Sequence, residues 1–210
     1  MTFTQTTSEH KPATEAEYLA HEAQADYKSQ FVDHAIYAMA GASAAHNRIV
    51  RNLIVSLSNC LNEGLCEVFP SDMLLRLPSG DYVYPDVSVV CEPVSIERKG
   101  RNGLDVLLNP TVVLEVLSES TENLDTGPKL MRYMEVPGLR YIVLVDSRKP
   151  YILLYARQQA DAWHVKMMQS RQQRDFTDTE PLELLECRND FAAIYRNVAF
   201  DTDNASTGEA

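Results

Sequence analysis

The apolar residues between Ser43 and Gly64 recur at intervals of three and four positions, which is typical of a helix with one buried face. The residues that form this stripe are Ile49, Leu53, Ile54, Leu57 and Leu61. Ser43 is a suitable N-cap and Gly64 can end the helix. Residues 15–28 are rich in alanine and glutamate, so they predict a second helix, which precedes the first.

Shorter apolar segments predict strands. Residues 31–39 predict one strand, which ends before Gly41, and residues 73–77 predict another, followed by a turn at residues 78–81. Residues 82–92 alternate between apolar and polar positions, as in a strand with one buried face. The alternation places Val83, Val87, Val89 and Cys91 on one face and Tyr84, Asp86 and Ser88 on the other.

The middle of the chain predicts a crossover. Residues 111–118 and 140–146 are apolar on both faces, as expected for strands in the centre of a covered sheet. Between them, residues 125–136 have Pro128 near the first turn and a helix-forming body. This order of strand, helix and strand is typical of a βαβ unit. Residues 151–157 and 162–168 then predict a hairpin, and residues 188–196 predict a short closing helix.

Together these elements predict an α/β or α+β fold with a mixed sheet and an additional hairpin. The length of 210 residues predicts a single domain, over residues 15–200. The polar ends, residues 1–14 and 201–210, are expected to be disordered tails.

The composition indicates a cytoplasmic protein that contacts no membrane. No apolar run approaches the ~20 residues of a membrane helix, and the first 24 residues do not have the pattern of a secretion signal. The four cysteines are scattered and form no Cys-x-x-Cys pair, so free thiols are expected at Cys60, Cys66, Cys91 and Cys187.

The net charge is −11 and the isoelectric point is about 4.9, which argues against a protein that coats nucleic acid through a broad basic face. An enzyme that meets nucleic acid in one local groove is still compatible with this charge. The densest basic segment, with Arg98, Lys99 and Arg101, could contact a phosphate backbone or could be a solvated loop.

Two carboxylates stand out because of their surroundings. Asp86 follows Pro85 on the polar side of an alternating segment, and Glu115 lies inside an apolar one. A buried carboxylate is normally paired, protonated or bound to a metal. Two acids on neighbouring strands could hold Mg²⁺ together with water and substrate phosphate, an arrangement that suits phosphodiester hydrolysis. The alternatives are a structural ion pair for Glu115 and a turn residue beside proline for Asp86.

Four further residues are candidates for the same cleft. Lys129 lies near the start of the predicted helix after the Glu115 strand, where it could reach a phosphate or an attacking water. Tyr133 shares its helix face, although tyrosines at this spacing are more often packing residues. His46 lies near the start of the Ser43 helix, and Ser118 follows the Glu115 strand. Motifs of serine hydrolases and of nucleotide-binding loops do not occur, and no His/Cys spacing predicts a zinc site.

The order of several segments resembles the Uma2 family, also described as DUF820, which is grouped with the PD-(D/E)XK restriction-endonuclease-like nucleases. The segments are YAMAGASAAHNRIVRNL, YPDVSVVCE, NPTVVLEVLSEST, DTGPKLMRY and LRYIVLVD. The resemblance covers residues 31–200. It implies a restriction-endonuclease-like core and a Mg²⁺- or Mn²⁺-dependent endonuclease acting on nucleic acid, most simply DNA. It also implies a homodimer, because two strands need two cuts.

The resemblance assigns Asp86 and Glu115 as metal ligands. The nuclease motif has a lysine two residues after the second acid, but Leu117 occupies that position here. Lys129 matches the lysine that this family takes from the following helix, where it would position water or stabilise developing phosphate charge. His46 matches a histidine of the early helix. A site of this kind predicts that Asp86, Glu115 and Lys129 converge in an open cleft.

The chain departs from the family pattern in residues 30–35, where the resemblance leads us to expect a glycine flanked by acids. His34 replaces the glycine, and Gln30 and Ala35 replace the acids, with Asp33 as an offset substitute. Two other functions therefore remain open. One is a degenerate nuclease fold that serves in binding or assembly, and the other is a regulator that acts through a partner in a mobile-element or defence system.

Overall fold

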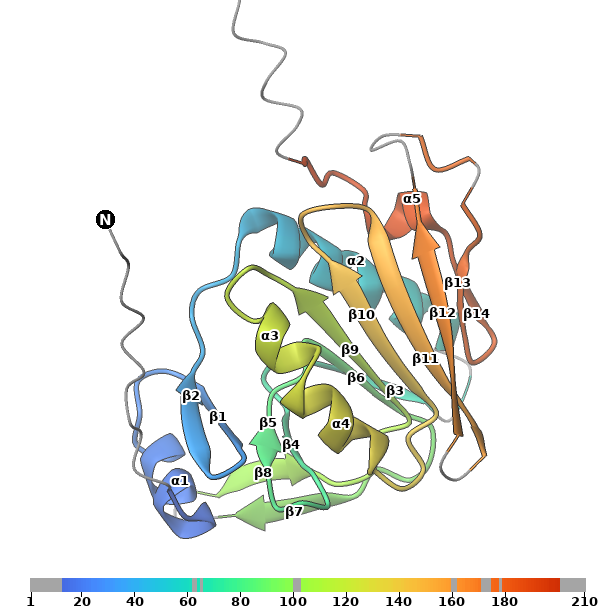
Figure 1. The fold of residues 1–210 in the computed structure, drawn as a ribbon. Coiled ribbons are helices and arrows are strands. Elements are labelled where there is room, and N and C mark those ends of the chain that lie inside the picture. Colours follow the sequence, from blue (N-terminus) through green and yellow to red (C-terminus); the bar gives the residue numbers. More distant parts are fainter. Residues whose placement is uncertain are drawn as a thin grey trace, which may run out of the picture.

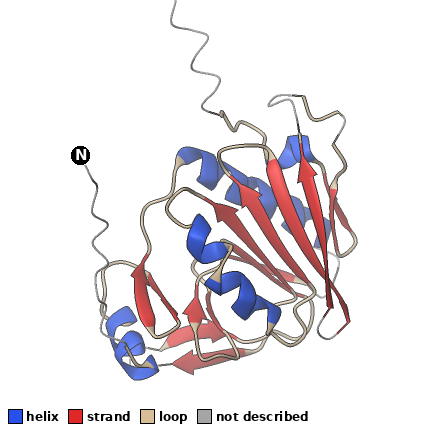
Figure 2. Ribbon diagram, in the orientation of Figure 1, coloured by secondary structure: helices blue, strands red, loops and turns tan. Residues whose placement is uncertain are grey.

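The computed structural model describes residues 13–61, 64, 66–99, 103–159, 162–170, 175–177 and 179–200. The predicted tail at residues 201–210, and most of the one at residues 1–14, lie outside these residues. Figure 1 and Figure 2 show helices on both sides of a large twisted sheet, with a smaller sheet packed at one end. The predicted mixture of helices with mixed sheets is therefore confirmed.

The larger sheet has six strands in the order β12-β11-β10-β9-β6-β3. Its centre is the parallel pair β9–β10, in which Val112 lies opposite Tyr141, and the other pairs are antiparallel. The strands are β3 (Glu67–Pro70), β6 (Val87–Val90), β9 (Val112–Leu117), β10 (Tyr141–Asp146), β11 (Tyr151–Gln159) and β12 (Ala162–Gln169). β9 is buried along its whole length, as its apolar sequence predicts.

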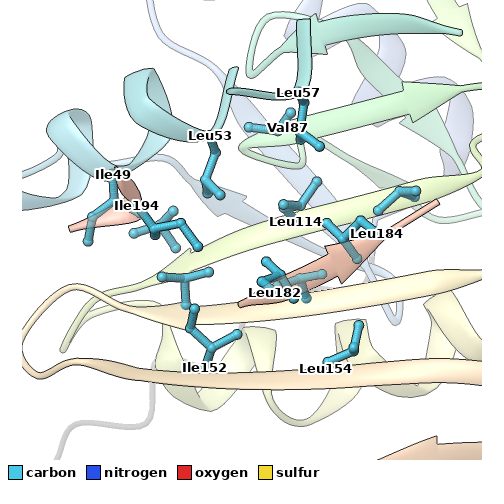
Figure 3. Close-up of a cluster of buried hydrophobic side chains, with 14 of the residues drawn as sticks. Ile49, Leu53, Leu57, Val87, Leu114, Ile152, Leu154, Leu182, Leu184 and Ile194 are labelled. Carbon is cyan, nitrogen blue, oxygen red and sulfur yellow. The ribbon is translucent and has the colours of Figure 1, made fainter. Parts of the chain in front are cut away.

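One face of this sheet packs against α2 (Ala44–Leu61), α5 (Phe191–Ile194) and the small sheet of β13 (Leu182–Leu184) and β14 (Cys187–Asn189). The predicted stripe of α2 supplies Ile49, Leu53 and Leu57 to this core. They meet Val87 and Leu114 from the sheet, together with Ile152, Leu182, Leu184 and Ile194 (Figure 3). The hydroxyl of Ser43 accepts the amide of His46, so the predicted N-cap is confirmed.

The other face packs against α3 (Glu122–Asp125) and α4 (Pro128–Met134), which lie in front of it in Figure 1. This core continues into the smaller sheet, so the two sheets share apolar side chains. The smaller sheet has the order β2-β1-β5-β4-β8-β7 and is also mixed. Its strands are β1 (Ser29–Val32), β2 (Ala35–Ala38), β4 (Leu74–Arg76), β5 (Tyr82–Val83), β7 (Ile96–Lys99) and β8 (Leu104–Leu107). Helix α1 (Glu15–Glu22) packs on it through Tyr18.

The predicted crossover is confirmed. The chain leaves β9, passes through α3 and α4, and returns as β10 parallel to β9. The predicted hairpin is also confirmed as the pair β11–β12.

Several predicted elements differ from the structure. Residues 31–39 are not one strand, because Asp33 and His34 adopt positive φ angles of 49° and 64° and turn the chain into the β1–β2 hairpin. Residues 82–92 divide into β5 and β6, which belong to different sheets. The segment with Arg98 and Lys99 is not a loop but the edge strand β7. Helix α1 ends at Glu22, earlier than predicted.

The prediction of free thiols is wrong. Cys60, at the end of α2, is bonded to Cys187 in β14, and Cys66 is bonded to Cys91. The second pair follows from the β3–β6 register, which pairs Glu67 with Val90 and so places the residues just outside them opposite each other. Neither pairing is visible in the spacing of the cysteines along the chain. Among the described residues, no helix is both long and apolar enough to cross a membrane.

Candidate functional site

The two predicted acids lie opposite each other where β6 and β9 leave their shared ladder. Val87 pairs with Leu114 and Ser88 with Val113, so continuing this antiparallel register by one residue places Asp86 beside Glu115. Oδ2 of Asp86 accepts the amide of Val116 at 2.7 Å. The carboxyl group of Asp86 is thus held against the backbone that carries Glu115.

Asp86 owes its place to the passage of the chain from one sheet to the other. β5 belongs to the smaller sheet and β6 to the larger one, and Pro85 lies between them. A proline cannot donate to a ladder, so it favours a break in pairing here. The segment is anchored at Tyr84, whose hydroxyl donates to Oε1 of Glu22 at 2.9 Å.

Glu115 lies in β9 on the face that packs against α4, and its side chain is nearly buried, with 3% exposure of the residue. Oε1 accepts the hydroxyl of Tyr133 at 2.5 Å and the ammonium of Lys129 at 2.6 Å. Both contacts use the same oxygen, so neither of them uses Oε2. The recorded partners of the Glu115 carboxyl are therefore a lysine and a tyrosine, and not an arginine as in a purely structural ion pair.

Lys129 projects from the first turn of α4 and is 1% exposed. Besides Glu115, its ammonium contacts Oδ1 of Asp125, the last residue of α3, at 2.8 Å. The structure thus confirms the geometric expectation that Lys129 reaches back from the helix to Glu115. The lysine position two residues after the acid, Leu117, is a buried core residue.

The junction between α3 and α4 is tight at Gly127. A Cβ atom at this position would lie 2.7 Å from the carbonyl oxygen of Asn123. The absence of a side chain therefore lets the two short helices approach each other, which brings Asp125 and Lys129 together across the junction.

His46, in the first turn of α2, reaches the site from the opposite side. Its Nε2 lies 3.2 Å from Oδ2 of Asp86, and its Nδ1 is buried without a hydrogen-bond partner among the described residues. The side chains of His46 and Asp86 are each 13% exposed. Glu115 and Lys129 are nearly buried, so the expectation that the site lies in an open cleft is wrong. Asp86 and His46 are the more exposed side of the site.

The pKa values of the site residues are shifted because several charged groups are buried close together. Burial raises the pKa of the Glu115 carboxyl to about 8, with Lys129 opposing the rise and Asp125 and Asp86 adding to it. Burial alone would lower the pKa of the Lys129 ammonium, but the ion pairs with Glu115 and Asp125 raise it above its ordinary value. Burial also opposes the charged form of His46, but the hydrogen bond with Asp86 and the nearby acids raise its pKa.

The phenol of Tyr133 stays protonated, because burial and the charge of Glu115 raise its pKa well above the ordinary value. It therefore acts as a donor to Glu115. Lys129 is shared by two acids, Glu115 and Asp125, and Asp86 is a third acid nearby, so additional positive charge would be stabilised there.

The other predicted residues have mixed outcomes. Ser118 follows β9, and its hydroxyl contacts those of Ser120 and Thr121, each at 3.1 Å, with no recorded contact to Asp86, Glu115 or Lys129 among the described residues. Arg98 and Lys99 lie in β7, on the far edge of the other sheet, and Lys99 pairs with Glu97. Arg101 lies outside the described residues. Asp33 is not an acid of the site, because it pairs with Arg132 at the hairpin turn.

Asp125 is the residue that sequence reasoning did not assign to the site. It is 3% exposed and ion-paired with Lys129. The signal was its position four residues before a candidate lysine, a spacing that places side chains on one helix face. This spacing was not sufficient to assign Asp125 to the site, because the two residues belong to two separate short helices and not to one.

The donor set suits a hard divalent cation. Within the part of the chain that the structure describes, no three His, Cys, Asp or Glu side chains are grouped as a complete metal site. Mg²⁺ commonly takes only one or two protein carboxylates and completes its shell with water and substrate phosphate. Asp86 and Glu115, which lie one residue beyond the last pair of the β6–β9 ladder, fit that requirement.

Sequence and structure comparisons agree on one family. The Uma2 family, described as "Putative restriction endonuclease", matches residues 15–190. The uncharacterized protein slr1290 of Synechocystis sp. is 34% identical over 187 residues, which cover 88% of this chain and 92% of that protein. A second uncharacterized Synechocystis protein, sll1609, is 38% identical over 138 residues, covering 65% of this chain and 76% of that protein.

Among solved structures, the fold is similar to the crystal structure of "a putative nuclease belonging to DUF820" from Anabaena variabilis. The TM-score is 0.69 at 16% identity, and the match covers 88% of this chain and 98% of that one. At this identity the likeness shows the fold, which is restriction-endonuclease-like. With the family match over most of its length, the chain belongs to the Uma2 family.

Proposed function

We propose that the protein is a metal-dependent endonuclease that hydrolyses phosphodiester bonds of nucleic acid, most simply DNA. The observation that supports this best is that Asp86, Glu115 and Lys129 lie close together although they come from three parts of the fold. Asp86 comes from the passage between the two sheets, Glu115 from β9 and Lys129 from α4. Family membership and the name of the Anabaena neighbour point to the same class of reaction.

In this proposal, Asp86 and Glu115 would hold Mg²⁺ or Mn²⁺, which would supply positive charge beside the scissile phosphate and would lower the pKa of an attacking water. Lys129 contributes a second, fixed positive charge that stabilises developing phosphate charge. His46 orients the Asp86 carboxyl through Nε2. The hydroxyl of Tyr133 holds Glu115 through Oε1, which fixes the direction of that side chain.

The charge of the whole chain supports a dependence on cations. A protein with a net charge of −11 repels a polyanion, and the acids of the site add to the repulsion locally. Positive charge at Asp86 and Glu115 would remove this barrier at the point where the phosphate must approach.

The test is cleavage of plasmid and single-stranded DNA and of RNA with Mg²⁺, with Mn²⁺ and with chelator. We expect cation-dependent cleavage by the wild type and a loss of at least about a hundredfold in Glu115→Gln, Asp86→Ala and Lys129→Met. Asp146→Asn is the matched control, because Asp146 is another buried, ion-paired acid, but its partner is Arg148 and, within the described part of the chain, it has no recorded contact with Asp86, Glu115 or Lys129. Equal activity in Glu115→Gln and wild type would contradict the proposal.

A second candidate is a degenerate nuclease fold that binds or assembles without cleaving. One observation favours it: Gln30, at a position where the family resemblance leads us to expect an acid, is buried, and its Oε1 lies 3.4 Å from the amide of Tyr84. Calorimetric titration with Mn²⁺ separates the candidates. Binding by the wild type that is lost in Glu115→Gln supports the nuclease, and equal behaviour of the two proteins supports the second candidate.

The proposed reaction also suggests a homodimer, since cutting both strands of a duplex needs two sites. Sedimentation equilibrium with and without DNA measures the number of chains per particle. A monomer that cuts both strands at one position would contradict the dimer.

A further inference from the structure

If Glu115 binds a cation, as in the function proposed above, the buried ammonium of Lys129 loses part of its stabilisation. This ammonium is almost wholly buried and has two acid partners, at 2.6 Å and 2.8 Å. A buried charge without a partner is very costly. When the carboxylate of Glu115 is shared with a second cation, its attraction for the ammonium is weakened, so the other partner must keep Lys129 in place.

Asp125 is suited to that task. It is buried, it is the last residue of α3, and it therefore belongs to a different element from Glu115, which lies in β9. Among the described residues, Lys129 is the only partner that the structure records for its side chain in a hydrogen bond or ion pair. The close approach of α3 and α4 at Gly127 fixes the distance between them.

We propose that Asp125 is a positioning residue, which holds the Lys129 ammonium in place beside the reacting phosphate while Glu115 is engaged by the cation. The inference rests on the proposed function for its consequence in catalysis. Its structural part, the retention of the ammonium, can be tested without any cleavage.

The first experiment observes the ammonium directly by ¹H–¹⁵N NMR of lysine side chains in the metal-free protein and with saturating Mg²⁺. A buried, hydrogen-bonded ammonium exchanges slowly with water, so Lys129 should give its own signal, identified by its loss in Lys129→Met. We expect the signal to persist with Mg²⁺ in the wild type and to disappear with Mg²⁺ in Asp125→Asn. A signal that survives in Asp125→Asn with Mg²⁺ would overturn the proposal.

Asp81→Asn is the matched control for this measurement. Asp81 is also a buried acid that pairs with a cation of α4, since its Oδ2 lies 3.3 Å from Nε of Arg132, but it takes no part in the contacts of Glu115. The Lys129 signal should be the same in Asp81→Asn and in the wild type. Loss of the signal in both variants would mean that α4 as a whole has loosened, which would also overturn a specific role of Asp125.

The second experiment measures the rate and the cation affinity of the same variants. Asp125→Asn should lower kcat by about tenfold or more and change KM by less than about threefold, with no further loss when it is added to Lys129→Met. Mn²⁺ affinity by calorimetry should change by less than about threefold. Additive losses in the double variant, or loss of Mn²⁺ binding in Asp125→Asn, would overturn the positioning role.

A third variant moves Asp125 without altering any charge. Gly127→Ala places a Cβ against the carbonyl of Asn123 and should push α3 from α4, so it should reproduce the loss of kcat. Gly41→Ala is its control, because a Cβ there meets no atom within 4 Å. If the wild type cleaves no nucleic acid, the proposed function fails, and the NMR result with Mg²⁺ still decides whether Asp125 retains Lys129.

Discussion

At the scale of single residues, the candidate site is centred on the Glu115 carboxyl group, for which a proton, the Lys129 ammonium and the proposed cation would compete. Glu115 was predictable from its own surroundings, because an acid in an apolar strand needs a partner. Its actual partners were not all predictable. Tyr133 and Lys129 were candidates from helix spacing and family resemblance, whereas the role of Asp125 depends on the packing of α3 against α4.

The raised pKa of Glu115 predicts that cation binding strengthens with pH. Because the pKa of the Glu115 carboxyl is about 8, a cation that binds at a lower pH must displace a proton. The affinity for Mn²⁺ should therefore rise by about tenfold between pH 6 and pH 7. Calorimetry at pH 6.5 in buffers of different ionisation enthalpy measures the protons released. His46→Gln should release the same number of protons per cation as the wild type, which separates Glu115 from His46. A flat pH profile in the wild type would contradict the prediction.

At the scale of elements, apolar periodicity predicted the helix α2, the strands β9 and β10 and the hairpin β11–β12, because each has a long, consistent pattern. It failed where the chain changes direction within an apolar segment. The alternation over residues 82–92 does not reveal that the segment passes between sheets at Pro85. Likewise the turn of the β1–β2 hairpin lacks the glycine that would have marked it.

That turn gives a prediction about stability. His34 has a φ of 64°, a left-handed conformation that glycine adopts most easily, and the family resemblance also leads us to expect glycine there. His34→Gly should raise the free energy of unfolding by about 0.5–1 kcal/mol, measured by denaturant titration. His34→Ala should not, because it keeps the backbone conflict and loses the edge-on contact with Phe31. Equal stabilities of the two variants would show that the conformation carries no cost.

At the scale of the whole molecule, the family and the layered fold could be predicted, because the order of segments is preserved along most of the chain. The disulfides could not. Cys60 and Cys187 are 127 residues apart, and only the packing of α2 on β14 brings them together. Spacing along the chain contains no information about such long-range neighbours.

The two disulfides should contribute unequally to stability. Closing the 127-residue separation of Cys60 and Cys187 is worth about 5 kcal/mol, and closing the 25-residue separation of Cys66 and Cys91 is worth about 3.5 kcal/mol. The pair of substitutions Cys60→Ala and Cys187→Ala should therefore lower the free energy of unfolding more than Cys66→Ala with Cys91→Ala. Denaturant titration without reductant measures this. If reductant leaves the wild type unchanged, the bonds do not contribute.

The ammonium of Lys129 has a consequence for how the protein assembles. Many sites built from several acids cannot close until an ion arrives to neutralise them, so the chain stays unfolded without its metal. Here the ammonium of Lys129, which belongs to the crossover between β9 and β10, neutralises part of the repulsion between the acids inside the core. Folding should therefore not depend on a bound ion. The chain should reach its final shape in a medium stripped of divalent ions and should keep that shape when a chelator is added.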